Sequence, residues 1–414
     1  MSLILFIKKQ GAVTLFIVGL LVGIATAYAV YRDKDRSIID SIAYIPSTGS
    51  MASSSTATTS VPISSGAKDD AELLSKIDQL FIIGFRGVEY SNSPELKRAL
   101  AETNLGGIIL FDYDTPSKKY VRNIQDFTQV QTLISDAQAK AKHKLIVAID
   151  EEGGLVSRLK SIPGYTKTPS AKALGTMSDA KVEQTASDLA STLKKLGFNM
   201  NFAPVLDVNV NPSNPVIGKV DRSFSSDEQV VVSKGLAFYR GLQKQGIISA
   251  VKHFPGHGSS QADTHLGFVD ISSSYKAYEL EPFKSACSAG VPMVMVGHLF
   301  NKNVDAQYPT TLSKKHIDVL KKDAGCTTQV VVSDDMDMGA ITKLYGKKEA
   351  LTRAINAGVD ILVISNNIGM YNPREFFDAR KIVFDQVKAG AISKSRIDEA
   401  YKAIQHLKET YLIY

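Results

Sequence analysis

The sequence predicts a single (β/α)₈ barrel of the TIM type, in the α/β class, and three observations indicate it. Short apolar runs typical of buried strands alternate with amphipathic stretches typical of helices from residue 69 to residue 414. There are eight such runs, which favours a closed barrel over a doubly wound open sheet. Charged and polar residues follow most of the runs, where a barrel of this kind carries its functional groups.

The eight predicted strands are bounded by changes from apolar to polar sequence. In order, they are 80–85, 106–111, 144–149, 200–205, 247–251, 291–296, 329–332 and 359–364. Helical periodicity is clearest between them at 181–196, 228–243 and 347–357. Gly197, Gly246 and Gly358 follow these three stretches at or near the position where glycine commonly ends a helix.

The first 68 residues differ from the rest of the chain. Residues 11–31 contain no charge and are long enough to cross a bilayer, with basic residues on both sides. The sequence around Ala27 to Ala29 also resembles a signal-peptidase site, so a cleaved export signal and an uncleaved anchor both remain open. Residues 46–66 are dominated by Ser, Thr and Ala and contain too few large apolar residues to fold alone.

These features predict three parts of the chain. Residues 1–31 form a hydrophobic helix that is a membrane anchor or a signal segment, residues 32–68 form a flexible linker, and residues 69–414 form the barrel domain. A stalk behind a hydrophobic segment would serve little purpose in the cytoplasm. We therefore expect the folded part to lie outside the membrane, in the cell envelope or secreted.

The composition is that of an ordinary globular protein. There are 48 Lys and Arg against 42 Asp and Glu, and the resulting charge of +6 is dispersed, so no nucleic-acid surface is indicated. The two cysteines, Cys287 and Cys326, lack metal-ligand spacing. Each is expected to be a small buried thiol, and no disulfide framework is predicted.

Residues that can carry chemistry gather after the apolar runs. They are Asp150 after the third run, Asp207 after the fourth, Lys252 and His253 after the fifth, His298 after the sixth, and Asp334 and Asp335 after the seventh. Because the carboxyl ends of parallel barrel strands meet at one rim, these side chains should converge there.

The densest cluster is the glycine-rich loop 252–265, which contains His253, His257 and His265. An acid, a base and a carboxylate around a barrel mouth suit glycoside hydrolysis. Asp334 could attack a sugar carbon, while His265 could donate and then accept a proton with Asp263 orienting it.

A competing interpretation is metal-assisted hydrolysis. Its ligands would be His253, His257, His265, His298 and Asp334. The residues alone leave this possibility open, although no His-x-His or His-Glu-x-x-His spacing supports it and Lys252 would repel a cation.

Five ordered segments resemble those of family 3 glycoside hydrolases. They are 150–158 (DEEGGLVSR), 201–208 (NFAPVLDV), 221–224 (DRSF), 252–258 (KHFPGHG) with Asp263 and His265, and 333–336 (SDDM). The similarity covers nearly the whole chain from residue 70. It is greatest to bacterial β-N-acetylhexosaminidases that act on peptidoglycan fragments.

The resemblance implies a function and a set of roles. The expected activity is retaining hydrolysis of terminal β-linked N-acetylglucosamine, from muropeptides or related glycans, without a metal or cofactor. Asp334 would be the nucleophile, and His265 paired with Asp263 would be the acid and base. The residues expected to hold the sugar are Asp150, Arg158, Arg222, Lys252 and His253. Leu155 and the pair Ser259–Ser260 depart from the family pattern, which commonly has Arg at the first position and Asp-Thr at the second.

Two other functions remain possible at this point. A glycoside phosphorylase could use the same scaffold, since a histidine acid/base avoids placing a second carboxylate where phosphate must bind. A non-catalytic glycan-binding protein is less compatible with the sequence, because binding alone requires neither a nucleophile nor a proton shuttle.

Overall fold

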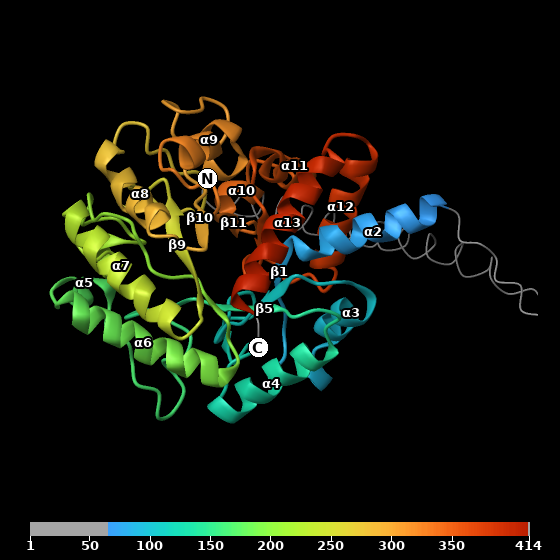
Figure 1. The fold of residues 1–414 in the computed structure, drawn as a ribbon, viewed down its shortest axis with the longest axis horizontal. Coiled ribbons are helices and arrows are strands. Elements are labelled where there is room, and N and C mark those ends of the chain that lie inside the picture. Colours follow the sequence, from blue (N-terminus) through green and yellow to red (C-terminus); the bar gives the residue numbers. More distant parts are fainter. Residues whose placement is uncertain (1–64, 413–414) are drawn as a thin grey trace, which may run out of the picture. The chain divides into compact units, whose positions relative to one another are not determined.

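A computed structural model of the protein describes residues 65–412. Eight parallel strands close into a barrel in the order β1-β12-β11-β10-β9-β8-β5-β2, and helices form an outer ring around them (Figure 1). Each predicted run supplies one strand of this barrel, so the predicted fold is confirmed. The strands are β1 Phe81–Gly84, β2 Gly107–Ile109, β5 Ile146–Ile149, β8 Met200–Asn201, β9 Ile248–Phe254, β10 Met293–Val296, β11 Val330–Asp335 and β12 Ile361–Ile364.

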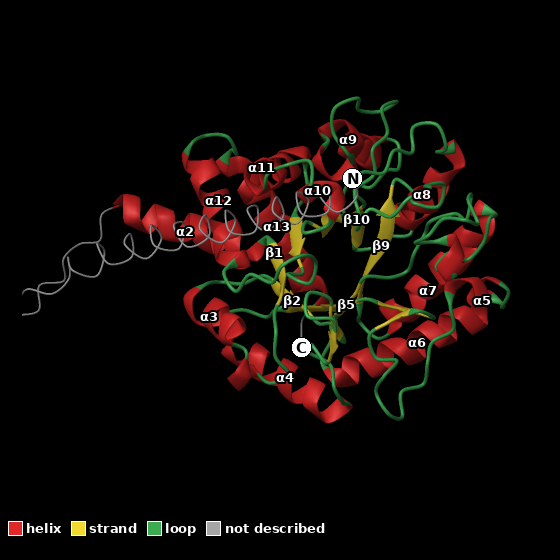
Figure 2. Cartoon of the chain, turned by 180° about the vertical axis from the view of Figure 1, so that it is seen from behind, coloured by secondary structure: helices red, strands yellow, loops and turns green. Residues whose placement is uncertain are grey.

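The helices surround these strands (Figure 2). They are α2 Ser65–Gln79, α3 Pro94–Glu102, α4 Phe127–Lys140, α5 Ala171–Gly175, α6 Asp179–Leu196, α7 Glu228–Lys244, α8 Glu281–Ser288, α9 Lys314–Lys322, α10 Gly339–Thr342, α11 Lys347–Ala357, α12 Glu375–Lys388 and α13 Lys394–Tyr411. Gly197 and Gly358 end α6 and α11 in the left-handed conformation, with φ of 95° and 116°, which explains the choice of glycine there.

The segment 1–31 and most of the linker 32–68 lie outside the described residues. Helix α2 begins at Ser65, so it includes the last four positions assigned to the linker. Within residues 65–412, no helix combines the length and the apolar character that a membrane crossing requires.

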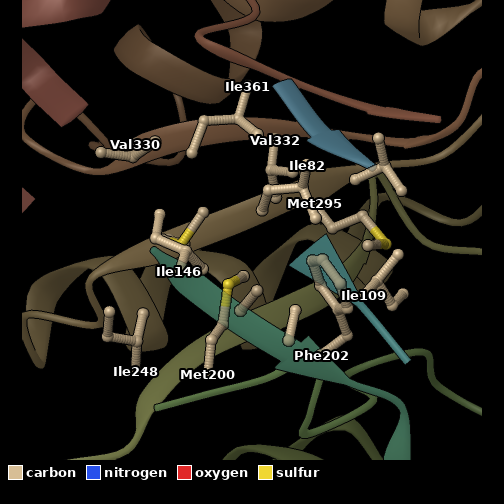
Figure 3. Close-up of a cluster of buried hydrophobic side chains, with 14 of the residues drawn as sticks. Ile82, Ile109, Ile146, Met200, Phe202, Ile248, Met295, Val330, Val332 and Ile361 are labelled. Carbon is tan, nitrogen blue, oxygen red and sulfur yellow. The ribbon is translucent and has the colours of Figure 1, made fainter. Parts of the chain in front are cut away.

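The interior of the barrel is filled by apolar side chains (Figure 3). Those labelled there are at most 4% exposed: Ile82, Ile109, Ile146, Met200, Phe202, Ile248, Met295, Val330, Val332 and Ile361. Such packing is expected because the inward-facing positions of a closed eight-stranded barrel fill its centre with branched and large side chains.

Helix α13 covers the end of the barrel where the strands begin. The buried ammonium of Lys408 donates hydrogen bonds to the carbonyl oxygens of Gly106 (2.9 Å) and Lys144 (2.9 Å), and to Oε1 of Gln79 (2.8 Å). Gly106 immediately precedes β2, and Lys144 lies two residues before β5. The helix therefore binds the amino ends of these neighbouring strands together.

Cys287 and Cys326 form a disulfide, with their Cα atoms 5.1 Å apart, so the prediction of two separate buried thiols is wrong. Cys287 lies in α8, just before β10, and Cys326 lies just before β11. Because β10 and β11 pair in parallel, the segments that lead into them are neighbours. The 39-residue separation in sequence conceals this proximity.

Two short hairpins extend loops at the carboxyl ends of the strands. One joins β3 (Tyr113–Asp114) to β4 (Lys119–Tyr120), and the other joins β6 (Glu151–Gly153) to β7 (Val156–Ser157). Both lie on the side of the barrel that carries the predicted functional residues.

Candidate active site

A pocket of about 260 Å³ opens at the carboxyl ends of the barrel strands. It is lined by seven of the eight site residues that the sequence predicted: Asp150, Arg158, Arg222, Lys252, His253, His265 and Asp334. The eighth, Asp263, contacts the imidazole of His265. The structure thus brings together residues separated by up to 184 positions of sequence (334 − 150), as parallel barrel strands require.

Asp334 lies near the end of β11 and faces the pocket. Its Oδ1 accepts a hydrogen bond from the backbone N–H of Asp335 at 2.8 Å. Burial alone would raise the pKa of this carboxyl group, but the imidazoles of His298, His253 and His265 outweigh burial and lower the pKa to about 2. Asp334 is therefore ionised at neutral pH and can act as a nucleophile.

The adjacent Asp335 makes different contacts. Its carboxylate accepts hydrogen bonds from the hydroxyl and the backbone N–H of Ser365, which follows β12, and from the N–H of Asp337. Its carbonyl oxygen accepts from Nε2 of His298 at 2.9 Å. Asp335 thereby joins the ends of β11 and β12 and holds the backbone next to the nucleophile.

His265 lies on the loop after β9, with just over half of its side chain exposed (52%). Its Nδ1 lies 2.8 Å from Oδ1 of Asp263. An ionised carboxylate can only accept, so Nδ1 carries the hydrogen and Nε2 is left for proton exchange. Burial opposes the charged imidazole, but Asp263 and the nearby Asp334 outweigh it and raise the pKa of His265 above its usual value.

A cluster of opposite charges forms one wall of the pocket. The ammonium of Lys252 lies 2.8 Å from Oδ1 of Asp150 and 2.7 Å from Oε1 of Glu152. The guanidinium of Arg222 binds both oxygens of Glu152, each at 2.7 Å. Burial opposes the ionised form of each acid, but the cations outweigh it and hold the pKa values of Asp150 and Glu152 below their usual range.

Arg158 is less tightly held than the other cations of this wall. Its guanidinium is 3.6 Å from Asp150 and 3.8 Å from Asp112, and its buried Nε has no hydrogen-bond partner within the described residues. The charged donors and acceptors of this wall can form strong directional hydrogen bonds to the hydroxyl and amide groups of a sugar.

The tautomer of His253 follows from its two partners. Its Nδ1 lies 2.7 Å from Oδ2 of Asp207, and its Nε2 lies 3.3 Å from Nη2 of Arg222. Arg222 only donates, so Nε2 accepts and Nδ1 carries the hydrogen that Asp207 receives. Asp207 also accepts from the backbone N–H groups of His253 and His257, so it fixes both this imidazole and the start of the loop.

The residues of the metal alternative have other partners and do not form a coordination site. His257 binds the hydroxyls of Ser260 and Thr264, and His298 binds Thr311 and the backbone of Asp335. Within residues 65–412, no three His, Cys, Asp or Glu side chains are arranged to hold a metal ion.

Sequence reasoning did not assign site roles to Glu152 and Asp207. Glu152 bridges Lys252 and Arg222, and Asp207 orients His253. The sequence placed Asp207 among the polar residues that follow the predicted strands, but it did not indicate that Asp207 contacts His253. Asp112 directly follows the second apolar run, and applying the same rule to that run would have placed it near the sugar-binding wall.

Comparison with known proteins identifies the class of enzyme. Residues 72–407 match the family described as "Glycosyl hydrolase family 3 N terminal domain", so the chain belongs to glycoside hydrolase family 3. Both the barrel and the catalytic class expected from the sequence are thereby confirmed.

Within this family, the chain is similar to several individual proteins. The chain is 34% identical over 295 residues to "Beta-hexosaminidase LpqI" of Mycobacterium tuberculosis, which covers 69% of this chain and 71% of the relative. It is 32% identical over 294 residues to "Beta-hexosaminidase A" of Pseudoalteromonas piscicida, covering 66% of this chain but only 47% of that longer relative. The solved family 3 β-N-acetylglucosaminidase of Paenibacillus sp. str. FPU-7 superposes with a TM-score of 0.74 at 34% identity, covering 82% of this chain and 63% of that one.

Proposed function

We propose that this enzyme removes terminal β-linked N-acetylglucosamine from glycans with retention of configuration at the anomeric carbon. The observation that carries the proposal is the pocket in which an ionised Asp334 and the Asp263–His265 pair face the same space. The names of the related β-hexosaminidases and the solved β-N-acetylglucosaminidase support the choice of sugar.

The first step forms a covalent intermediate. An oxygen of Asp334 attacks the anomeric carbon, the bond to the glycosidic oxygen breaks, and Nε2–H of His265 protonates that oxygen as the aglycone leaves. The raised pKa of His265 favours the protonated acid that this step requires.

The second step releases the sugar. Neutral Nε2 of His265 takes a proton from water, and the water oxygen attacks the anomeric carbon as the bond to Asp334 breaks. Two displacements on the same carbon restore the original configuration. Asp263 stabilises the imidazolium whenever it forms, because its carboxylate accepts the Nδ1 hydrogen.

The charged wall accounts for recognition of the sugar. We assign Asp150, Arg158, Arg222, Lys252 and His253 to the hydroxyl and acetamide groups. Glu152 and Asp207 stay behind them, where they fix Arg222, Lys252 and His253 in place. A wall fixed before substrate arrives can stabilise the distorted ring of the transition state without reorganising.

Muropeptides are the natural substrates that we propose, in the cell envelope outside the cytoplasm, with residues 1–31 as the membrane attachment or export signal. Two features support this location. Residues 11–31 are uncharged, and Cys287 and Cys326 form a disulfide, a bond that persists mainly in oxidising compartments.

A pair of substrates tests the catalytic assignment. His265→Ala should slow hydrolysis of an unactivated N-acetylglucosaminyl disaccharide by roughly 10²-fold to 10⁴-fold, because its leaving group needs a proton. An aryl glycoside with a good leaving group should lose much less in its first step. Equal losses on both substrates, measured as kcat/KM, would contradict the role of His265.

A further inference from the structure

The tip of the loop that carries His265 binds the segment that follows the nucleophile. The backbone N–H of Gly339 donates to the carbonyl oxygen of His265 at 3.1 Å, and the N–H of Ala340 donates to that of Thr264 at 3.0 Å. The ammonium of Lys343 donates to the carbonyl oxygen of Leu266 at 2.8 Å. Gly339 is only five positions after Asp334, so the contact joins the two reacting groups through a short stretch of chain.

In the described part of the chain, these three are the only hydrogen bonds that join residues 262–268 to a segment outside their own loop. Every other hydrogen bond of residues 262–268 stays within the loop between β9 and α8. Among the side chains at the tip, Leu266 is 71% exposed, whereas the ring of Phe268 contacts that of Phe300 with centroids 5.1 Å apart. Among the described residues, the hydrogen bonds that reach the tip around His265 from outside its own loop therefore all come from the segment 339–343.

Gly339 has a steric role in this contact. A Cβ atom built on it would lie 2.7 Å from the carbonyl oxygen of His265, and 2.9 Å and 3.0 Å from the carbonyl carbon and oxygen of Leu266. These are backbone atoms, which cannot move aside as the end of a flexible side chain can. The φ angle of Gly339 lies outside the left-handed region, so the position needs glycine for space and not for backbone freedom.

We infer that Gly339 and Lys343 are positioning residues for proton transfer, which hold His265 at a fixed place relative to Asp334. This inference rests on the proposed function, because it concerns the proton that His265 gives and takes. A methyl group at position 339 would displace the loop by a few tenths of an ångström or more. Nε2 of His265 would then lie farther from the glycosidic oxygen, and proton transfer would slow because it depends on hydrogen-bond distance.

The test compares a glycine substitution inside the segment with one just after it, at the start of α11. Gly339→Ala should reduce kcat/KM for an unactivated N-acetylglucosaminyl disaccharide by roughly 10-fold to 10³-fold, within the range that loss of general acid help can reach, while activity on an activated aryl glycoside changes only a few-fold. Gly346→Ala is the matched control, because a Cβ there meets nothing within 4 Å and its φ is −66°. It should leave both activities unchanged.

Combining substitutions separates positioning from general damage. If Gly339 acts through His265, the double variant Gly339→Ala/His265→Ala should be no slower than His265→Ala alone on either substrate. Lys343→Met should show a smaller loss with the same dependence on leaving group, and Lys343→Arg, which keeps a donor, should restore most of it. Since Lys343 is exposed, this pair remains informative if Gly339→Ala fails to fold.

Two results would overturn the inference. One is an equal loss on both substrates in folded Gly339→Ala, and the other is a further loss in the double variant beyond that of His265→Ala. Amide hydrogen exchange of residues 262–268 provides a readout that needs no substrate: it should rise in Gly339→Ala and stay unchanged in Gly346→Ala. If the wild-type enzyme fails to cleave N-acetylglucosaminides, the proposed function fails, and this exchange measurement still decides whether segment 339–343 holds the loop.

Discussion

Two adjacent aspartates at the end of β11 have separate tasks. Both border the pocket, but side chains alternate in direction along a strand, and the carboxylate of Asp335 is held by Ser365 at the next strand end while that of Asp334 is not. The sequence was enough to propose Asp334 as the nucleophile, because the Ser-Asp-Asp segment can be read from it. It was not enough to find the partners of Asp207 or Glu152, which lie 46 positions or more away along the chain.

Substituting each aspartate should reveal the nucleophile. Asp334→Asn keeps the shape but removes the attacking charge, so turnover should fall by roughly 10⁴-fold or more on activated and natural substrates alike, with sugar binding largely retained. Asp335→Asn should lose far less. A fluorinated slow substrate should label Asp334, which peptide mapping by mass spectrometry can check. A label on Asp335 or Asp150, or an inverted product by NMR, would refute the assignment.

Removing the partner of the acid should change the pH dependence. Asp263 helps to raise the pKa of His265, so Asp263→Asn should lower that pKa and leave less imidazolium at neutral pH. For an unactivated disaccharide, kcat/KM falls as pH rises through the His265 pKa, so this alkaline limb should move to lower pH in the variant. An unmoved limb would show that another group sets it. The acid limb belongs to Asp334, whose pKa is lowered to about 2, and should not move.

At the scale of elements, strands were easier to predict than their connections. The barrel strands are buried on both faces, so they appear in the sequence as continuous apolar runs that are easy to recognise. The run at 200–205 is the partial exception. Its regular ladder ends after Asn201, and Pro204 has no N–H to donate. The hairpins β3–β4 and β6–β7 have strands of two or three residues, too short for any periodicity to show.

The disulfide is also a property of neighbouring elements. It joins α8 to the segment before β11 and closes a loop of 39 residues, so in the chain-entropy view it should stabilise the fold by roughly 3–4 kcal/mol. The double variant Cys287→Ser/Cys326→Ser should have a correspondingly lower denaturation midpoint than the wild-type enzyme. Its kcat/KM should be little changed, because neither cysteine lines the pocket. Denaturation of the wild type with and without a reductant should reproduce the difference. Equal midpoints would show that the bond contributes nothing to stability.

At the scale of the whole molecule, the two ends of the barrel have different surfaces. Among the described residues, the large apolar side chains that remain exposed all lie in connections between a barrel strand and the outer helix that follows it. They are Tyr120, Val121, Leu155, Leu266, Phe268, Tyr278, Leu344 and Met370.

The N-terminal part should be separable from the catalytic part. The described residues 65–412 belong to one compact unit, so a chain that begins at Ser65 should fold and keep kcat/KM on a soluble aryl N-acetylglucosaminide within about 3-fold of the full chain. In cell fractionation, the full chain should sediment with membranes or be exported, and the shortened chain should do neither. A folded but inactive shortened chain, or a cytosolic full chain, would contradict this division.

The pocket is closed at its base, and this determines how substrate enters and how products leave. Ile109, Phe202, Met295 and Val363 line its base, with the packed barrel interior beneath them and α13 across the far end. A sugar bound at the base can enter and leave only by the mouth, which agrees with the proposed removal of terminal residues one at a time. The aglycone departs first and the monosaccharide last, and a returning monosaccharide occupies the place of the next chain end. Free N-acetylglucosamine should therefore be a competitive inhibitor. The rate of hydrolysis would then fall as this product accumulates.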